Sequence, residues 1–122
     1  MANPSTVPAS AAGTEILRRV YINTMTGTND YVLLNGVANY TYTILSVIFC
    51  EVAGVTTDSF NMSVEYDGGS TKIHLIKSQP IGSNETFVWN EKIILSETDE
   101  LVVSNATNAI DVYCTYIEQR WS

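Results

Sequence analysis

Residues 40–52 read Tyr-Thr-Tyr-Thr-Ile-Leu-Ser-Val-Ile-Phe-Cys-Glu-Val, and this stretch decides the fold. It is rich in β-branched and aromatic residues and contains no Gly or Pro, which favours a strand over a helix. Alternation assigns Tyr40, Tyr42, Ile44, Ile48 and Val52 to one face and Leu45, Val47 and Phe49 to the other. Because both faces are apolar, we expect a central strand with a second layer on one side and more chain or another subunit on the other.

The rest of the chain supplies short alternating segments separated by turn residues. We expect strands at 15–24, 31–34, 59–66, 71–78, 86–95, 101–104 and 110–120. Between 59–66 and 71–78, residues 67–70 (Asp-Gly-Gly-Ser) read as a tight hairpin turn, with Ile73 and Leu75 as the inward pair of the second strand. About eight strands with no helical period predict an all-β, antiparallel β-sandwich with jelly-roll or related Greek-key winding; a closed barrel is the alternative.

The length of 122 residues is enough for one domain with its own core. We expect residues 14–122 to form a single β-sandwich domain. Residues 1–13 are mostly small, with Pro and Gly, and we expect an extended N-terminal arm or a disordered tail. No stretch has the length of a membrane span or the pattern of a signal peptide, which predicts assembly in a cytoplasm.

The composition is acidic and poor in charge. Hydrophobic residues make up 45% of the chain and charged residues only 16%, so we expect part of the surface to be covered by partners. The formal net charge of −7 argues against a nucleic-acid groove and against binding to anionic membranes.

Few residues suggest catalysis or metal binding, and we predict no catalytic residue, metal site or cofactor. His74, the only histidine, is expected to point outward, and no nucleophile, phosphate loop or metal-ligand spacing accompanies it. Cys50 and Cys114 read as two buried thiols, with a disulfide between adjacent strands as the alternative. The acidic residues fall mostly at turns, where contact with solvent explains them better than a carboxylate pair or a calcium loop does.

Seven tyrosines and two tryptophans are too many for the core of one small sandwich. Because Tyr and Trp are enriched at the centres of interfaces, we expect an oligomer contact that includes Tyr113, Tyr116 and Trp121; packing in the core is the competing role. The first strand divides into Ile16, Arg18, Val20 and Ile22 on one face and Leu17, Arg19 and Tyr21 on the other. Arg18 and Arg19 are therefore surface residues on opposite faces or partners in ion pairs between subunits.

Segments from the central strand onward resemble a known group of proteins. These segments are 45–50 (Leu-Ser-Val-Ile-Phe-Cys) with the loop and alternating strand after it, 80–83 (Pro-Ile-Gly-Ser), 94–103 (Ile-Leu-Ser-Glu-Thr-Asp-Glu-Leu-Val-Val) and 110–118 (Ile-Asp-Val-Tyr-Cys-Thr-Tyr-Ile-Glu). Across residues 40–118 the chain resembles small β-sandwich structural proteins of tailed-bacteriophage virions. Several of these coat the capsid as decoration (cement) proteins or sit at the neck or tail.

The resemblance implies a non-enzymatic virion structural protein, assembled in the host cytoplasm. The leading expectation is a capsid decoration protein that binds the major capsid protein or other virion proteins and stabilises the shell as an oligomer, with a trimer favoured. A neck, tail or baseplate adaptor is the alternative, and a carbohydrate-binding sandwich that stacks sugars on Trp89 or Trp121 is a further one. The candidate interface residues are Arg18, Arg19, Tyr40, Tyr42, Tyr113, Tyr116 and Trp121.

Overall fold

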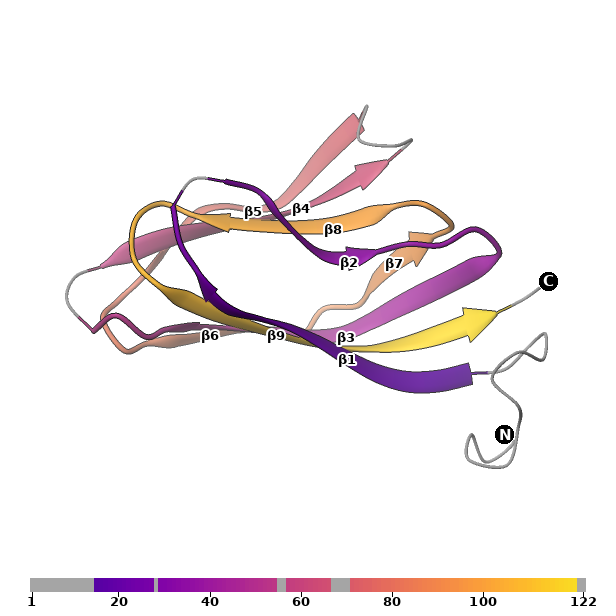
Figure 1. Cartoon of the computed structure of the whole chain (residues 1–122), viewed down its shortest axis with the longest axis horizontal. Coiled ribbons are helices and arrows are strands. Elements are labelled where there is room, and N and C mark those ends of the chain that lie inside the picture. The colour runs from indigo at the N-terminus through magenta and orange to yellow at the C-terminus, as the bar shows by residue number, and fades with distance from the viewer. Residues whose placement is uncertain (1–14, 28, 55–56, 67–70, 121–122) are drawn as a thin grey trace.

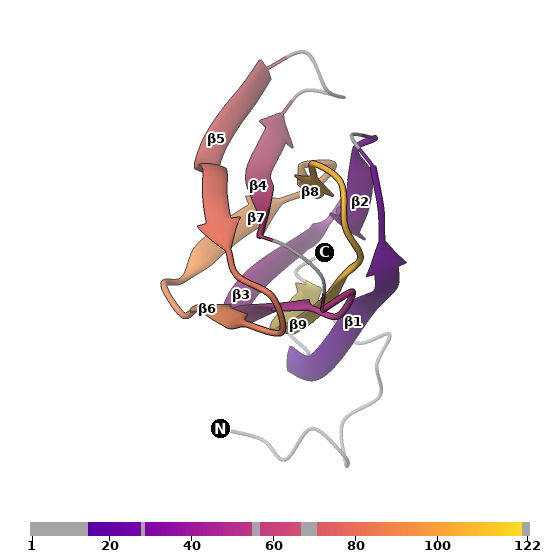
Figure 2. The same ribbon diagram turned by 90° about the vertical axis from the view of Figure 1, so that its left-hand side faces the viewer.

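The computed structural model describes residues 15–27, 29–54, 57–66 and 71–120, which form two antiparallel β-sheets (Figure 1). The strands are β1 (Glu15–Met25), β2 (Tyr31–Asn35), β3 (Tyr40–Glu51), β4 (Asp58–Tyr66), β5 (Thr71–Ile81), β6 (Thr86–Trp89), β7 (Ile93–Ser96), β8 (Glu100–Asn105) and β9 (Ile110–Arg120). One sheet, termed the β3 sheet, has the order β1-β9-β3-β6, with β7 also paired to β3; the other, termed the β4 sheet, has the order β2-β8-β4-β5. Figure 2 shows the two layers from one end. The predicted all-β sandwich is confirmed.

The chain winds between the sheets as a jelly roll. It crosses from one sheet to the other at every connection except β4 to β5 and β6 to β7, and its first and last strands, β1 and β9, lie side by side. This order agrees with the predicted winding rather than with the closed barrel. The described residues form nine strands instead of about eight, because the predicted strand 86–95 is divided. Strand β6 pairs with residues 47–50 of β3, and β7 pairs with residues 41–44.

An irregularity in β3 decides which of its side chains reach the core. The register of β3 against β9 shifts between Ile44 and Ser46, so the side-chain alternation reverses at this β-bulge. The inward residues on the two sides of the bulge, each at most 2% exposed, are Tyr42, Ile44, Val47 and Phe49. The predicted division of this strand placed Ile44 and Val47 on opposite faces. It is wrong beyond Ile44, because it assumed an unbroken period of two.

Aromatic rings fill the core along the length of β3. Phe49 of β3 stacks on Phe60 of β4, with ring centroids 4.2 Å apart, and Phe87 of β6 approaches Phe60 edge-on at 5.2 Å. These contacts join the two sheets. Farther along β3, the rings of Tyr42 and Tyr116 have centroids 6.0 Å apart. The core therefore runs from the β6 end of the β3 sheet to the β7 end.

Strand β5 departs most from its prediction. Register shifts on either side of Met62 disturb its pairing with β4. As a result Ile76 is buried, whereas Ile73 is 45% exposed. Of the predicted inward pair, Leu75 packs against the core as a half-buried residue, and the prediction is wrong for Ile73.

Three predictions concern residues outside the described part of the chain: the interface contact of Trp121, the arm at 1–13 and the hairpin turn at 67–70. The strands that flank this turn do pair, with Tyr66 opposite Thr71. Across the described ranges, no helix has the length and hydropathy needed to cross a bilayer.

A buried carboxylate fixes the loop between β8 and β9. Asp58 is 4% exposed and accepts hydrogen bonds from the backbone N–H groups of Thr107 and Asn108, at 3.0 and 2.9 Å, and from the side-chain amide of Asn105, at 3.0 Å. Burial by itself would raise the pKa of Asp58, but these hydrogen bonds and one from the N–H of Ser59 lower the pKa below its ordinary value. The carboxylate therefore ties the start of β4 to the connection that leads into β9.

Replacing Asp58 with Asn is expected to lower the free energy of unfolding at neutral pH by about 2–3 kcal/mol, because an amide cannot accept all of these hydrogen bonds. The folded state holds the pKa of Asp58 below that of the unfolded chain. Its contribution is therefore complete above the unfolded pKa of about 4 and is lost as the pH falls through the lower folded pKa. Urea unfolding of wild type and Asp58→Asn at a series of pH values measures the difference. A difference that stays constant from neutral to acid pH would contradict this role.

Candidate functional site

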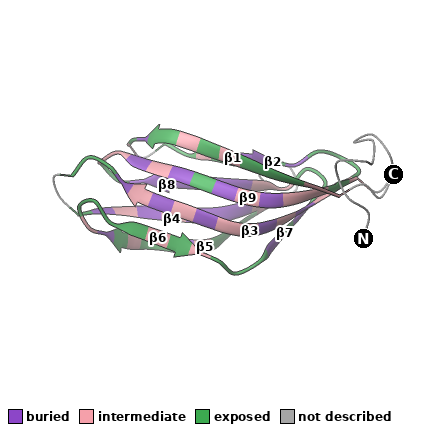
Figure 3. Ribbon diagram, turned by 90° about the horizontal axis from the view of Figure 1, so that it is seen from below, coloured by how far each residue is buried: buried purple, intermediate pink, exposed green. Residues whose placement is uncertain are grey.

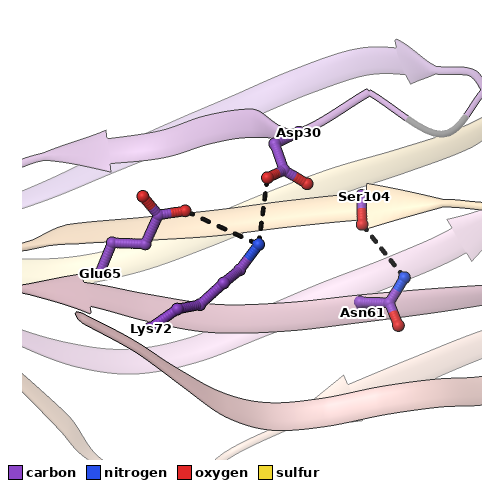
Figure 4. A network of polar contacts seen from close by, with 5 residues as sticks. All are labelled: Asp30, Asn61, Glu65, Lys72 and Ser104. Atoms are coloured by element: carbon purple, nitrogen blue, oxygen red, sulfur yellow. Dashed lines mark hydrogen bonds and ion pairs between the residues drawn. The ribbon is translucent and has the colours of Figure 1, made fainter. Parts of the chain in front are cut away.

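The outer face of the β4 sheet carries paired polar side chains, together with Val32, which is 49% exposed, and Val102, which is buried. Lys72 Nζ lies 3.1 Å from Asp30 Oδ2 and 3.8 Å from Glu65 Oε2. Asn61 Nδ2 donates a hydrogen bond of 3.1 Å to Ser104 Oγ (Figure 4). These groups are suited to contact with water.

The outer face of the β3 sheet is apolar. Its large outward side chains, which are 40–64% exposed, are Leu17 and Tyr21 of β1, Tyr113 of β9, Val88 of β6 and Ile94 of β7. Strand register places them in two rows across the sheet, one through Tyr21, Tyr113, Ile48 and Val88 and one through Leu17, Ile117, Thr43 and Ile94. Figure 3 views this side of the molecule, where exposed segments mark β1, β6 and the middle of β9. The whole outer surface of the β3 sheet, which carries these two rows, is termed the apolar face.

Charged side chains are scarce on the apolar face. Among the described residues that point outward from the β3 sheet, only Glu15, Arg19 and Asp111 carry a charge. Glu15 lies at the first position of β1. Arg19 and Asp111 lie on opposite sides of the Tyr21–Tyr113 pair along the strands. An outer surface with so few charges is typical of the centre of a protein interface rather than of a solvated face.

Two shallow hollows border the Tyr21–Tyr113 pair. Leu17 and Thr115 line the first hollow, Ile48, Cys50 and Asp111 line the second, and Arg19 and both tyrosines border each of them. The hollows are open to solvent, whereas small-molecule sites enclose most of their ligand. The shape therefore suits a broad contact with another protein surface.

Four of the predicted interface residues lie together at the β7 end of the core. Tyr40 stacks on Tyr42 with ring centroids 6.1 Å apart, and Tyr42 and Tyr116 are both buried. Arg18 Nε forms an ion pair of 3.2 Å with Glu118 Oε1 of the neighbouring strand in the same chain. Burial, and then the negative charge of Glu118, raise the pKa of Tyr42 and of Tyr116. Tyr42 and Tyr116 take the competing role of core residues, and we do not assign them to an interface.

Two other predicted residues, Arg19 and Tyr113, lie on the apolar face. They sit on adjacent strands and border the same hollow. The seventh predicted residue, Trp121, lies outside the described residues.

Sequence reasoning did not select four of the five large exposed residues of the apolar face. Leu17 and Tyr21 could have been found, because alternation in the first strand placed them on one face with Arg19. Val88 and Ile94 had no comparable signal, since the predicted strand 86–95 gave no sign that it divides between β6 and β7. Their place in the two rows follows only from their pairing with β3.

The two cysteines are free and lie on opposite faces of the β3 sheet. Cys114 points into the core, and burial raises the pKa of its thiol to about 12. Cys50 is half-buried and lines a hollow of the apolar face. The disulfide considered from the sequence is therefore not formed, because the sheet lies between the two side chains.

The described residues contain no group of three or more His, Cys, Asp and Glu side chains able to hold a metal ion. His74 is exposed on the outer face of the β4 sheet, opposite Ser63. Trp89, one of the two candidate sugar platforms, is half-buried against the core, and its Nε1 donates a hydrogen bond of 2.8 Å to the carbonyl of Glu91. The ring therefore contributes part of its surface to the core.

Comparisons with known proteins support the fold alone. No protein-family model and no curated protein matches the sequence. The chain is similar to one from Bacillus endospore appendages, which form disulfide-linked pili, with a TM-score of 0.53, 14% identity, and 96% of this chain and 97% of that chain covered. It is also similar to the Drosophila NLP core, a structure that was related to pentamer formation and histone binding. The TM-score is 0.54 at 12% identity, with 88% of this chain and 99% of that chain covered. A chain of infectious bursal disease virus matches at 7% identity, with 100% of this chain and 41% of that chain covered. Its TM-score of 0.49 is too low to support an argument.

Proposed function

We propose that this chain is a non-enzymatic structural protein of a bacteriophage virion, most specifically a decoration protein that binds the major capsid shell and stabilises it as an oligomer. The observation that carries the proposal is the apolar face. Its two rows of apolar side chains lie on one sheet, whereas the outer face of the other sheet carries ion pairs and hydrogen bonds and fewer large exposed apolar side chains. The molecule therefore has one adhesive side and one more polar side.

The apolar face has about the size of one side of a stable interface. Strands β1 and β9 are each 11 residues long, and a rise of about 3.3 Å per residue makes them about 35 Å long. Four strand positions at about 4.8 Å give a width of about 19 Å and an area of about 700 Å². Stable interfaces bury about 800 Å² per partner, so a single partner can cover this face.

The fold is compatible with the role of an assembly subunit. The Bacillus appendage chain belongs to pili, and the Drosophila core chain to a pentamer. For this chain we propose that residues 1–13 act as an arm that attaches the domain at 14–122 to the shell. A neck, tail or baseplate position would use the same adhesive face, so copy number separates the two locations.

The copy number of the chain in purified virions is expected to be near one per major capsid protein, because a decoration protein covers the whole shell. Quantitative mass spectrometry of purified particles measures it. A handful of copies per particle would instead indicate a neck, tail or baseplate adaptor. Absence from virions contradicts both positions.

A matched pair of valines tests the adhesive face. Val88 of β6 and Val32 of β2 are 53% and 49% exposed, the first on the apolar face and the second on the outer face of the β4 sheet. Val88→Asp is expected to lower oligomer affinity about tenfold, because it places a charge beneath the partner, whereas Val32→Asp leaves the affinity unchanged. Sedimentation velocity over a range of concentrations measures both. An equal loss in the two variants would show that the apolar face has no special part.

A further inference from the structure

We infer that the partner of the apolar face is a second copy of this chain, packed face to face about a two-fold axis that runs across the strands near the Tyr21–Tyr113 pair. The inference rests on the proposed function, since it names the partner of the same surface. The arrangement of charge, the shape of the face and its area support it.

The charges of the apolar face are complementary to themselves. Read along the strands, Arg19 comes first, then the Tyr21–Tyr113 pair, and then Asp111. A two-fold axis at the tyrosine pair reverses this order in the second copy. Arg19 of each chain therefore lies over the side of the apolar face on which the other chain has Asp111. One symmetry operation produces two ion pairs, as an isologous interface requires.

Both charged groups are placed to meet a partner. Arg19 is exposed and forms no ion pair within the described residues, whereas its neighbour Arg18 is paired with Glu118. Asp111 Oδ1 accepts a hydrogen bond of 2.8 Å from the backbone N–H of Thr24, which holds the carboxylate in position. In the two-fold arrangement, Arg19 of one copy and Asp111 of the other lie on neighbouring strand positions, so they are offset sideways by about 4.8 Å. The long arginine side chain can span this offset.

The shape and size of the face also fit its own copy. Because hollows border the tyrosine pair, the tyrosine rings of a second copy have room to lie beside those of the first. Tyr and Arg are the residue types most enriched at the energetic centre of interfaces. The area of about 700 Å² is close to the share of one partner in a standard interface of about 1,600 Å² in total.

An isologous contact closes with two chains, because each copy uses the same surface. This arrangement differs from the trimer predicted from the sequence resemblance. The mass of the oligomer therefore distinguishes the two.

Charge reversal with complementation tests the pairing. Arg19→Glu alone places two negative groups together at each of the two contacts, and Asp111→Lys alone places two positive groups together. Each variant by itself is expected to dimerise at least about tenfold more weakly than wild type in sedimentation equilibrium. An equimolar mixture of the two variants is expected to recover most of the lost affinity, because the heterodimer has opposite charges at both contacts.

Two controls accompany this test. Asp111→Asn removes the charge but keeps an oxygen that can accept the N–H of Thr24, so it separates the loss of the ion pair from a local loss of structure. Val32→Asp, on the opposite sheet, should dimerise as wild type does. Circular dichroism checks that each variant is folded.

A mixture that associates no more tightly than either variant alone would overturn the inference, as would a wild-type mass of one or three chains. A wild-type monomer that is nevertheless present in virions, and is lost from them on Val88→Asp, overturns this inference and the oligomer but leaves the virion role of the apolar face standing. A dimer rescued by the mixture but absent from virions supports this inference and removes the virion role.

Discussion

The β-bulge between Ile44 and Ser46 is the constraint on which the rest of the structure depends. Strand β3 pairs with β9 along one edge and with β7 and then β6 along the other, so both sides of the bulge must contribute to one core. An unbroken strand would turn one half of its apolar side chains away from the β4 sheet. The extra residue keeps Tyr42 and Phe49 on the same inward face, where Phe49 stacks on Phe60 of the other sheet.

The same bulge also builds the outer surface. By turning Val47 and Phe49 inward it turns Ile48 outward, into the row between Tyr113 and Val88. The sandwich therefore has a second apolar layer on the outside of the β3 sheet, with nothing in the described chain packed over it. In its described part the outer face of the β4 sheet carries Val32 and Val102, but ion pairs and hydrogen bonds among Lys72, Glu65 and neighbouring polar groups lie beside them. This asymmetry is the structural basis of the assembly role that we propose.

Local pattern was enough to predict the architecture. Alternation and turn residues gave the two-layer sandwich, and the last strand was predicted with the observed bounds, Ile110–Arg120. Features that depend on which strand lies beside which could not be predicted. The bulge in β3 has no Gly or Pro to mark it, and the division of residues 86–95 into β6 and β7 follows from their pairing with different halves of β3.

The candidate surface was predicted in part for the same reason. The sequence indicated that the central strand would be covered on both sides, and it selected Arg19 and Tyr113, which do lie on the apolar face. It also selected Tyr42 and Tyr116, because an excess of tyrosines does not reveal which rings point inward. Only the register between strands assigns Tyr116 to the core and its near neighbour Tyr113 to the surface.

Hydroxyl-radical footprinting, read by mass spectrometry at low and high protein concentration, tests most directly whether the apolar face is the assembly surface. Tyr21 and Tyr113 report on this face, and His74 reports on the outer face of the β4 sheet. The account predicts that oxidation of the two tyrosines falls as the oligomer forms, while oxidation of His74 does not change. Oligomer formation that protects His74 and leaves both tyrosines as reactive as before would contradict it.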